Sequence, residues 1–235
     1  MSFDVALIVD SIPEILMGIG LTFQLLFLSL FLGTALAVLV LVMRISGRWY
    51  LMAPTMVYIY IFRGTPEILV LLLFYFGSAI ILTAIAQVFD PEIKFVDFPP
   101  FWAGSLAIAL IIGSYATETF RGAFLGVDPG QVEAARALGL SNLKTFIYVR
   151  IPAMWRLALP PFGNHMLSLI KDTALVAIIG LEETLFVAEQ AIGYTAKPFV
   201  MYILVGAIYL GFSTVITLSV MVLEKYANRH LEVAR

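Results

Sequence analysis

Residues 133–139 read Glu-Ala-Ala-Arg-Ala-Leu-Gly, and after nine further residues the chain continues with Val149-Arg150-Ile151-Pro152. This charged, helix-forming region stands between long apolar runs in a chain of which only 13% of residues are charged. Such a chain has little reason to keep a large polar element unless a partner docks there. The alternative is a loop that merely connects two apolar spans. The pattern favours a docking element.

Local signals divide this polar region into two short helices. Asp128 and Pro129 are typical of a helix start, with aspartate as the N-cap and proline at the first helical position. Gly139 ends this first helix, because glycine adopts the left-handed conformation without penalty. We expect Ser141 to cap a second helix over residues 142–150, which ends before the following proline. The two helices are expected to lie flat under a membrane.

The composition places the chain in a membrane. Hydrophobic residues make up 61% of the 235 residues, and the mean hydropathy is +0.99. Soluble domains average about half apolar and about a quarter charged residues. The net charge of −2 argues against a nucleic-acid partner. The absence of cysteine excludes disulfides and thiolate metal sites, and His165 and His230 lack metal-ligand spacing. No phosphate-loop motif occurs, so any nucleotide site of that type belongs to another chain.

We predict an all-α integral membrane protein with about five transmembrane helices, since about twenty apolar residues cross a bilayer. The five expected spans are Leu21–Met43, Thr55–Val88, Trp102–Phe124, about Pro161–Leu181, and Tyr202–Leu223. The predicted organisation is a short extracytoplasmic segment (residues 1–19), a transmembrane domain (20–225) with a cytoplasmic loop at about 127–156, and a cytoplasmic tail (226–235).

The distribution of lysine and arginine gives the expected orientation. Ten of the fourteen basic residues fall in one alternating set of loops, and the opposite set holds only Lys94 and Lys197. Basic residues favour the cytoplasmic side. We therefore expect the N-terminus outside and the C-terminus inside, with the polar element in the cytoplasm.

Polar residues within the spans mark a candidate pathway. His165, Ser168 and Asp172 recur at i, i+3 and i+7 and so share one helical face. Ionisable groups inside a membrane usually face a cavity or a partner. The Asp172 carboxylate would neutralise a cationic group of a solute, whereas Lys171 points elsewhere. The alternative is a helix-packing network that binds no ligand.

A second candidate is the interruption at residues 63–67, Arg-Gly-Thr-Pro-Glu. Pro66 removes a backbone hydrogen bond, so a kink is expected within the second span. Broken helices in transporters often mark the substrate path. The alternative is a structural kink with Arg63 anchored at the cytoplasmic interface. Further along, Glu118 and Arg121 are expected to form a local ion pair.

Four segments together resemble the polar amino acid branch of permease subunits from bacterial ABC importers. They are residues 61–66 (Ile-Phe-Arg-Gly-Thr-Pro), 118–123 (Glu-Thr-Phe-Arg-Gly-Ala), the polar segment quoted first, and 170–176 (Ile-Lys-Asp-Thr-Ala-Leu-Val). The type I importer fold of this family implies a groove of an ATPase subunit as the docking partner. The residues implied for this coupling are Glu133, Ala134, Ala135, Gly139 and Pro152. The residues implied for the substrate pathway are His165, Ser168, Asp172, Asn164, Arg63 and Thr65.

The resemblance also implies the partners. It implies a second permease subunit, a homologous chain rather than a self-copy, two ATPase subunits that bind ATP and magnesium, and a periplasmic substrate-binding protein. No cofactor is expected in this chain, which would lie among the lipids of the bacterial inner membrane. The closest group carries histidine, lysine, arginine, ornithine or opines. Many relatives have glutamate at the position of His165, which suggests that a partner subunit supplies the missing acid.

Two other classes of function remain to be weighed. An ion- or proton-coupled amino acid carrier could act without an ATPase, with Asp172 and His165 as a proton relay. Such a carrier usually has ten or more spans in internal repeats, whereas this chain has about five and no obvious repeat. A membrane-embedded enzyme would need a clustered catalytic constellation, and none is visible in the sequence.

Overall fold

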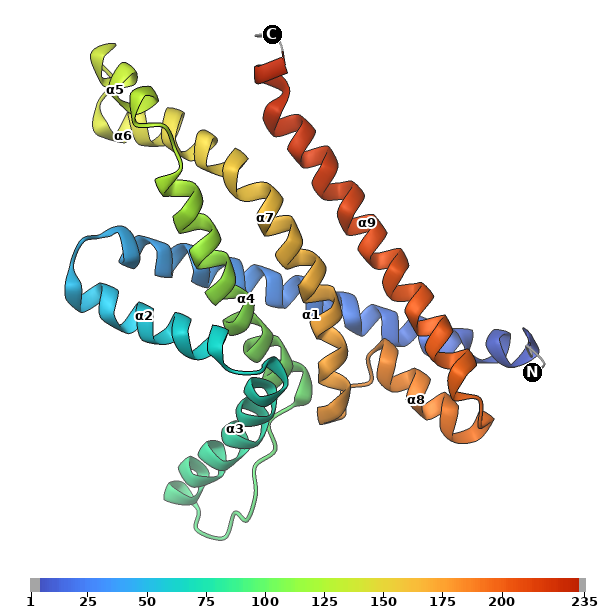
Figure 1. Cartoon of the computed structure of the whole chain (residues 1–235). Coiled ribbons are helices and arrows are strands. Elements are labelled where there is room, and N and C mark those ends of the chain that lie inside the picture. Colours follow the sequence, from blue (N-terminus) through green and yellow to red (C-terminus); the bar gives the residue numbers. More distant parts are fainter. Residues whose placement is uncertain (1–4, 233–235) are drawn as a thin grey trace.

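A computed structural model describes residues 5–232 of the chain, with side chains for residues 13–229. This part is helical, and no β-strand occurs within it. The helices are α1 (Val5–Ile45), α2 (Trp49–Gly64), α3 (Glu67–Phe89), α4 (Pro100–Leu125), α5 (Pro129–Ala137), α6 (Asn142–Thr145), α7 (Ile151–Asp172), α8 (Thr184–Thr195) and α9 (Pro198–Glu232) (Figure 1). A π-helical turn, Phe146–Arg150, precedes α7, and a 3-10 helix, Thr173–Ile179, follows it. The all-α membrane fold predicted from the sequence is confirmed.

Helix α4 is the centre of the packing. Helix α1 crosses it, and α2, α3 and α7 also contact it, while α9 packs on α7 (Figure 1). Most of the membrane-spanning part of α4 is buried, although the chain is largely apolar outside as well. Small residues permit this crowding, as is typical of helix contacts in membranes. At the crossing with α1, Gly33 lies against Ala109 and Ile112, and its carbonyl oxygen lies against Gly113.

Four of the described helices are long and apolar enough to cross a membrane. They are α1 from Pro13, α3, α4, and α9 as far as Arg229. The remaining expected span, about Pro161–Leu181, corresponds to α7, which is about 33 Å long at 1.5 Å per residue but carries several polar groups. The number of spans is therefore close to the predicted five.

The expected second span, Thr55–Val88, is two helices rather than one kinked helix. Thr65 and Pro66 both have extended backbone conformations, and they separate α2 from α3. Proline disfavours helical conformation at the residue before it and lacks an N–H for the helix ladder. The interruption is consequently a complete break, and α3 alone has the length of a span.

The prediction that the second cytoplasmic helix ends before Pro152 is wrong. The chain passes from α6 through the π-helical turn directly into α7, in which Pro152 lies in the first turn. The Ile151 N–H bonds to the Phe146 carbonyl across this wider turn. Proline is tolerated here because the first turn of a helix does not use its N–H. Helix α7 therefore begins before the expected start at Pro161 and gives way to the 3-10 helix after Asp172.

The N-terminal segment is continuous with the first span. From Val5 onward the backbone is helical and joins α1 without interruption, whereas residues 1–4 lie outside the described part. The division at residue 19 has no counterpart in the backbone. The placement of this segment outside the membrane stays a prediction.

The packing at Gly33 leads to a test of the α1–α4 contact. A Cβ atom at position 33 would lie 2.3 Å from the Ile112 side chain and 2.9 Å from the Ala109 carbonyl oxygen. Gly33→Ala should therefore destabilise the protein by about 1–3 kcal/mol, the usual cost of overpacking. Thermal unfolding of the detergent-purified protein should show a lower midpoint.

Gly20→Ala is the matched control, because Gly20 is also in α1 and a Cβ there meets nothing within 4 Å. That variant should keep or slightly raise the midpoint, since alanine is the better helix former. Equal midpoints for the two variants would contradict the close approach of α1 to α4.

Candidate functional site

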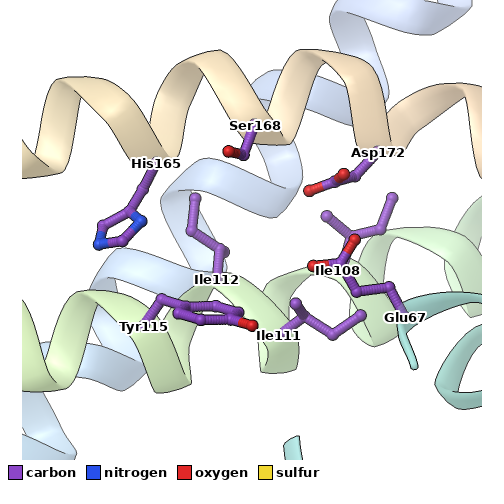
Figure 2. Close-up of a pocket in the computed structure, with 8 residues that line it drawn as sticks. All are labelled: Glu67, Ile108, Ile111, Ile112, Tyr115, His165, Ser168 and Asp172. Atoms are coloured by element: carbon purple, nitrogen blue, oxygen red, sulfur yellow. The ribbon is translucent and has the colours of Figure 1, made fainter. Parts of the chain in front are cut away.

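A cavity of about 240 Å³ lies between α4 and α7, beside the start of α3. Its eight lining residues are Glu67, Ile108, Ile111, Ile112, Tyr115, His165, Ser168 and Asp172 (Figure 2). The three polar residues of α7 point across the cavity toward the isoleucines and Tyr115 of α4. An apolar wall with a few convergent polar groups is the usual form of a small-molecule site.

One end of this cavity is acidic. Glu67 and Asp172 approach from α3 and α7, and both line this end of the cavity (Figure 2). Two carboxylates in a poorly hydrated cavity repel each other, and a cation placed between them relieves that repulsion. This end of the cavity is therefore suited to an ammonium or guanidinium group.

The other end of the cavity is closed by aromatic rings and hydrogen bonds. The ring centroids of His165 and Tyr115 lie 5.7 Å apart, and His165 Nε2 lies 2.8 Å from Thr119 Oγ1. Behind Tyr115, the Arg63 guanidinium lies 5.2 Å from the centroid of the phenol ring. Arg63 thus contributes positive charge just beyond the wall of the cavity.

Local sequence explains how these residues meet. Positions 165, 168 and 172 lie on one face of α7, and Ile111 and Tyr115 lie one turn apart on α4. Glu67 is the first residue of α3, and the extended residues Thr65 and Pro66 direct it toward α7. Negative charge is favoured at a helix N-terminus, which supports a carboxylate at this place.

The six candidate pathway residues have different positions. His165, Ser168 and Asp172 line one cavity together, and Arg63 lies behind it. Asn164 and Thr65 are not among the residues that line it. The sequence did not predict Glu67 and Tyr115 as site residues, although Glu67 belongs to the interruption at residues 63–67. Glu67 contributes a second acid to this cavity beside Asp172, and an acid from a partner subunit stays a prediction.

A charged cluster lies near the end of α4. The predicted pair is confirmed, with Arg121 Nη2 2.8 Å from Glu118 Oε2. Arg44, at the end of α1, binds the other oxygen, with Nη2 3.0 Å from Glu118 Oε1. Sequence spacing could not reveal Arg44, because it comes from a different helix.

A second buried carboxylate, Glu183, joins three helices. It is fully buried and caps α8 by accepting hydrogen bonds from the Leu185 and Phe186 amides, at 2.7 and 3.1 Å. Tyr209 of α9 donates to it at 2.8 Å, and Thr22 of α1 donates at 3.3 Å. This cluster fastens the first and last spans to the segment that follows the 3-10 helix.

The polar segment has the predicted turn. Asp128 Oδ1 accepts a hydrogen bond from the Gly130 amide at 2.8 Å, and Ser141 Oγ accepts one from the Lys144 amide. Gly139 has φ +82°, in the left-handed region. Helices α5 and α6 project at the far end of α4 and α7 from the α3–α4 connection (Figure 1).

One side of this element is open. Glu133, Ala134, Gly139 and Pro152 are exposed, but Ala135 is buried against its own chain. Ala135 therefore packs within its own chain in this structure, and its role in coupling stays a prediction. Instead, large apolar side chains are exposed on the element, namely Leu138, Leu143 and Tyr148, with exposed fractions of 83%, 67% and 69%. Their chemistry suits a groove in a partner protein.

Comparison with known proteins identifies the class. Residues 29–229 match the family described as "Binding-protein-dependent transport system inner membrane component", and the chain belongs to this family. It is a multi-pass inner-membrane permease subunit of an ABC importer, a kind of transporter that works with ATPase and substrate-binding partners. An ATPase-independent carrier has no support from these relatives.

Individual relatives agree over nearly the whole chain. It is 35% identical to the nopaline transport system permease protein NocM of Agrobacterium fabrum, covering 97% of this chain and 93% of NocM. It is 39% identical to the arginine ABC transporter permease protein ArtQ of Escherichia coli, covering 81% and 85% of the two chains. A crystal structure of an amino acid ABC transporter with histidines matches with a TM-score of 0.82 at 29% identity, covering 96% of this chain and all of the other.

A substitution at Gly139 tests the docking element. It strains the backbone without causing a steric clash. A Cβ atom at Gly139 meets nothing within 4 Å, so Gly139→Val acts through its positive φ alone. A β-branched residue is strained in that conformation by about 1–3 kcal/mol. We expect the variant to enter the membrane normally but to lose most ATP-driven uptake in proteoliposomes.

The control is Gly77→Val on α3, where a Cβ also meets open space and the backbone is helical. It should transport normally. Full uptake by Gly139→Val would show that the turn does not matter for coupling.

Proposed function

We propose that this permease subunit translocates polar amino acids with a cationic group, or related compounds, and that the cavity between α4 and α7 lies on their route. The observation that carries the proposal is the convergence of Glu67 and Asp172 at one end of the cavity (Figure 2). An α-ammonium or a basic side chain would bind there, while the apolar wall contacts the methylene groups. Relatives named for arginine and nopaline transport support this class of substrate.

The proposed assembly has two permease chains side by side, the second a homologue of this one. Two ATPase subunits, which bind ATP and magnesium, would dock against α5, α6 and the π-helical turn through the exposed Glu133, Leu138 and Tyr148. A substrate-binding protein would deliver the amino acid from the opposite face. In this arrangement, closure of the ATPase sites moves α5 and α6, and the direct connection through the π-helical turn carries that movement into α7.

Removal of one carboxylate charge tests the cavity. Asp172→Asn keeps the shape of the side chain but forfeits a charge-assisted hydrogen bond worth about 1.5–3 kcal/mol. Uptake of radiolabelled arginine at low concentration should fall by roughly ten- to a hundred-fold, with assembly and basal ATP hydrolysis largely kept.

Lys171→Met is the neighbouring control, because Lys171 is exposed and does not line the cavity. Its effect should fall on assembly first and leave the concentration dependence of uptake unchanged. Normal uptake by Asp172→Asn together with altered substrate dependence in Lys171→Met would place the route on another face.

We also infer that α5, α6 and the C-terminus are cytoplasmic and the N-terminus extracytoplasmic. The distribution of lysine and arginine supports this orientation. The chain has no cysteine, so single cysteines can be labelled cleanly. Lys94→Cys, in the exposed α3–α4 connection, should react with an impermeant thiol reagent added to spheroplasts, and Lys144→Cys on exposed α6 should not. Labelling of Lys144→Cys alone would reverse the orientation.

A further inference from the structure

A second, larger cavity of about 480 Å³ lies beside the first, between α1, α2 and α4. Its charged residues are Arg44, Arg63, Glu118 and Arg121. Three guanidinium groups face one carboxylate, so the cavity carries an excess of two positive charges. This is the opposite sign to the acidic end of the first cavity.

The positive charge is incompletely neutralised. Glu118 is shared by Arg44 and Arg121. Among the side chains that the structure describes, none forms an ion pair with Arg63, whose guanidinium lies instead over the Tyr115 ring. The Nε atom of Arg44 is buried without a hydrogen-bond partner. This buried Nε–H group favours an anionic acceptor, and a carboxylate can bind a guanidinium through both of its oxygens.

The two cavities are arranged in series along α4. Ile111 and Tyr115 line the first, and Glu118 lines the second, at positions i, i+4 and i+7 of one helical face. Arg63 stands at the boundary, because it lines the second cavity and contacts the Tyr115 ring of the first. Arg63 and Tyr115 therefore lie between the two cavities.

We propose, on the basis of the function proposed above, that the second cavity is a binding site for the α-carboxylate of the transported amino acid. Arg63 leaves the face of Tyr115 and binds the carboxylate together with Arg121 and Arg44. Glu118 holds these two arginines when the site is empty and competes with the incoming carboxylate. The two cavities thereby recognise the basic side chain and the α-carboxylate of one amino acid.

The test compares arginine with agmatine, which is arginine without its α-carboxylate. Binding of both to the purified permease–ATPase complex is measured by calorimetry in phosphatidylcholine nanodiscs, without the binding protein. Arg63→Gln should weaken arginine binding by about ten-fold, the loss of one charge-assisted hydrogen bond, and leave agmatine binding unchanged. Glu118→Gln removes the internal competitor and should tighten arginine binding without affecting agmatine. A gain in affinity cannot arise from misfolding.

Arg48→Gln is the matched control, because Arg48 is exposed at the start of α2, outside both cavities. It should leave both affinities unchanged. The proposal would be overturned if the ratio of arginine affinity to agmatine affinity were the same in Arg63→Gln and Glu118→Gln as in the unmodified protein. If the acidic end of the first cavity did not bind the cationic group, Asp172→Asn would bind both ligands with unchanged affinity, and this result would be separate from the outcome for Arg63.

A lipid phosphate is the other anion that the arginines of the second cavity can bind. A second set of nanodiscs distinguishes it from the amino acid carboxylate. If phosphatidylglycerol occupied the cavity, arginine binding would weaken in discs that contain it, and the weakening would vanish in Arg63→Gln. That result would assign the cavity to lipid and overturn the proposal. Equal arginine affinity in the two kinds of disc would support the amino acid carboxylate as the ligand.

Discussion

The close approach of α1 to α4 at Gly33 is the constraint on which the rest of the fold depends. The backbones come so near that the Gly33 carbonyl oxygen borders Gly113. In a lipid environment, apolar surface alone does not hold helices together, and close van der Waals contact between small residues takes its place. Tyr58 of α2 then reaches the Leu110 carbonyl oxygen at 2.6 Å, so α2 is fixed to the same helix. The crossing thereby sets where Arg63 and the start of α3 can lie.

The cavity forms where regular helices stop. Irregular backbone is tolerated at membrane depth only where it is buried in protein or faces a cavity. The 3-10 helix that begins directly after Asp172 is largely buried, and the extended Thr65 and Pro66 stand between Gly64 of the second cavity and Glu67 of the first. The packed centre and the broken helices thus have separate roles. The first holds the subunit together, and the second provides polar groups inside an apolar environment.

Features that depend only on neighbouring residues, such as shared helix faces and helix ends, could be predicted from the sequence. Helical periodicity placed His165, Ser168 and Asp172 on one face, and capping preferences located the turn at Gly139. Rules of the same local kind failed at Pro152, because the π-helical turn lets the helix continue through a residue that ordinarily ends one. A proline cannot donate a backbone hydrogen bond, but whether the helix ends at that proline depends on the turn that precedes it.

Contacts between distant segments lay beyond those rules. Glu67 and Asp172 are separated by more than a hundred residues, as are Thr22 and Glu183, and each pair comes from different helices. No spacing in the sequence links them, since their distance depends on how the helices cross.

The Glu183 cluster has a consequence for how the protein is made. Its hydroxyl donors come from the first span, at Thr22, and from the last, at Tyr209. During synthesis Glu183 leaves the ribosome before Tyr209, so for an interval a carboxylate bound for the interior lacks one of its partners. A chain truncated ahead of α9 would keep the amide and Thr22 donors to Glu183 but lose the Tyr209 hydroxyl. The hydrogen bonds that join the first span to the last through Glu183 are therefore complete only after the last helix has been made.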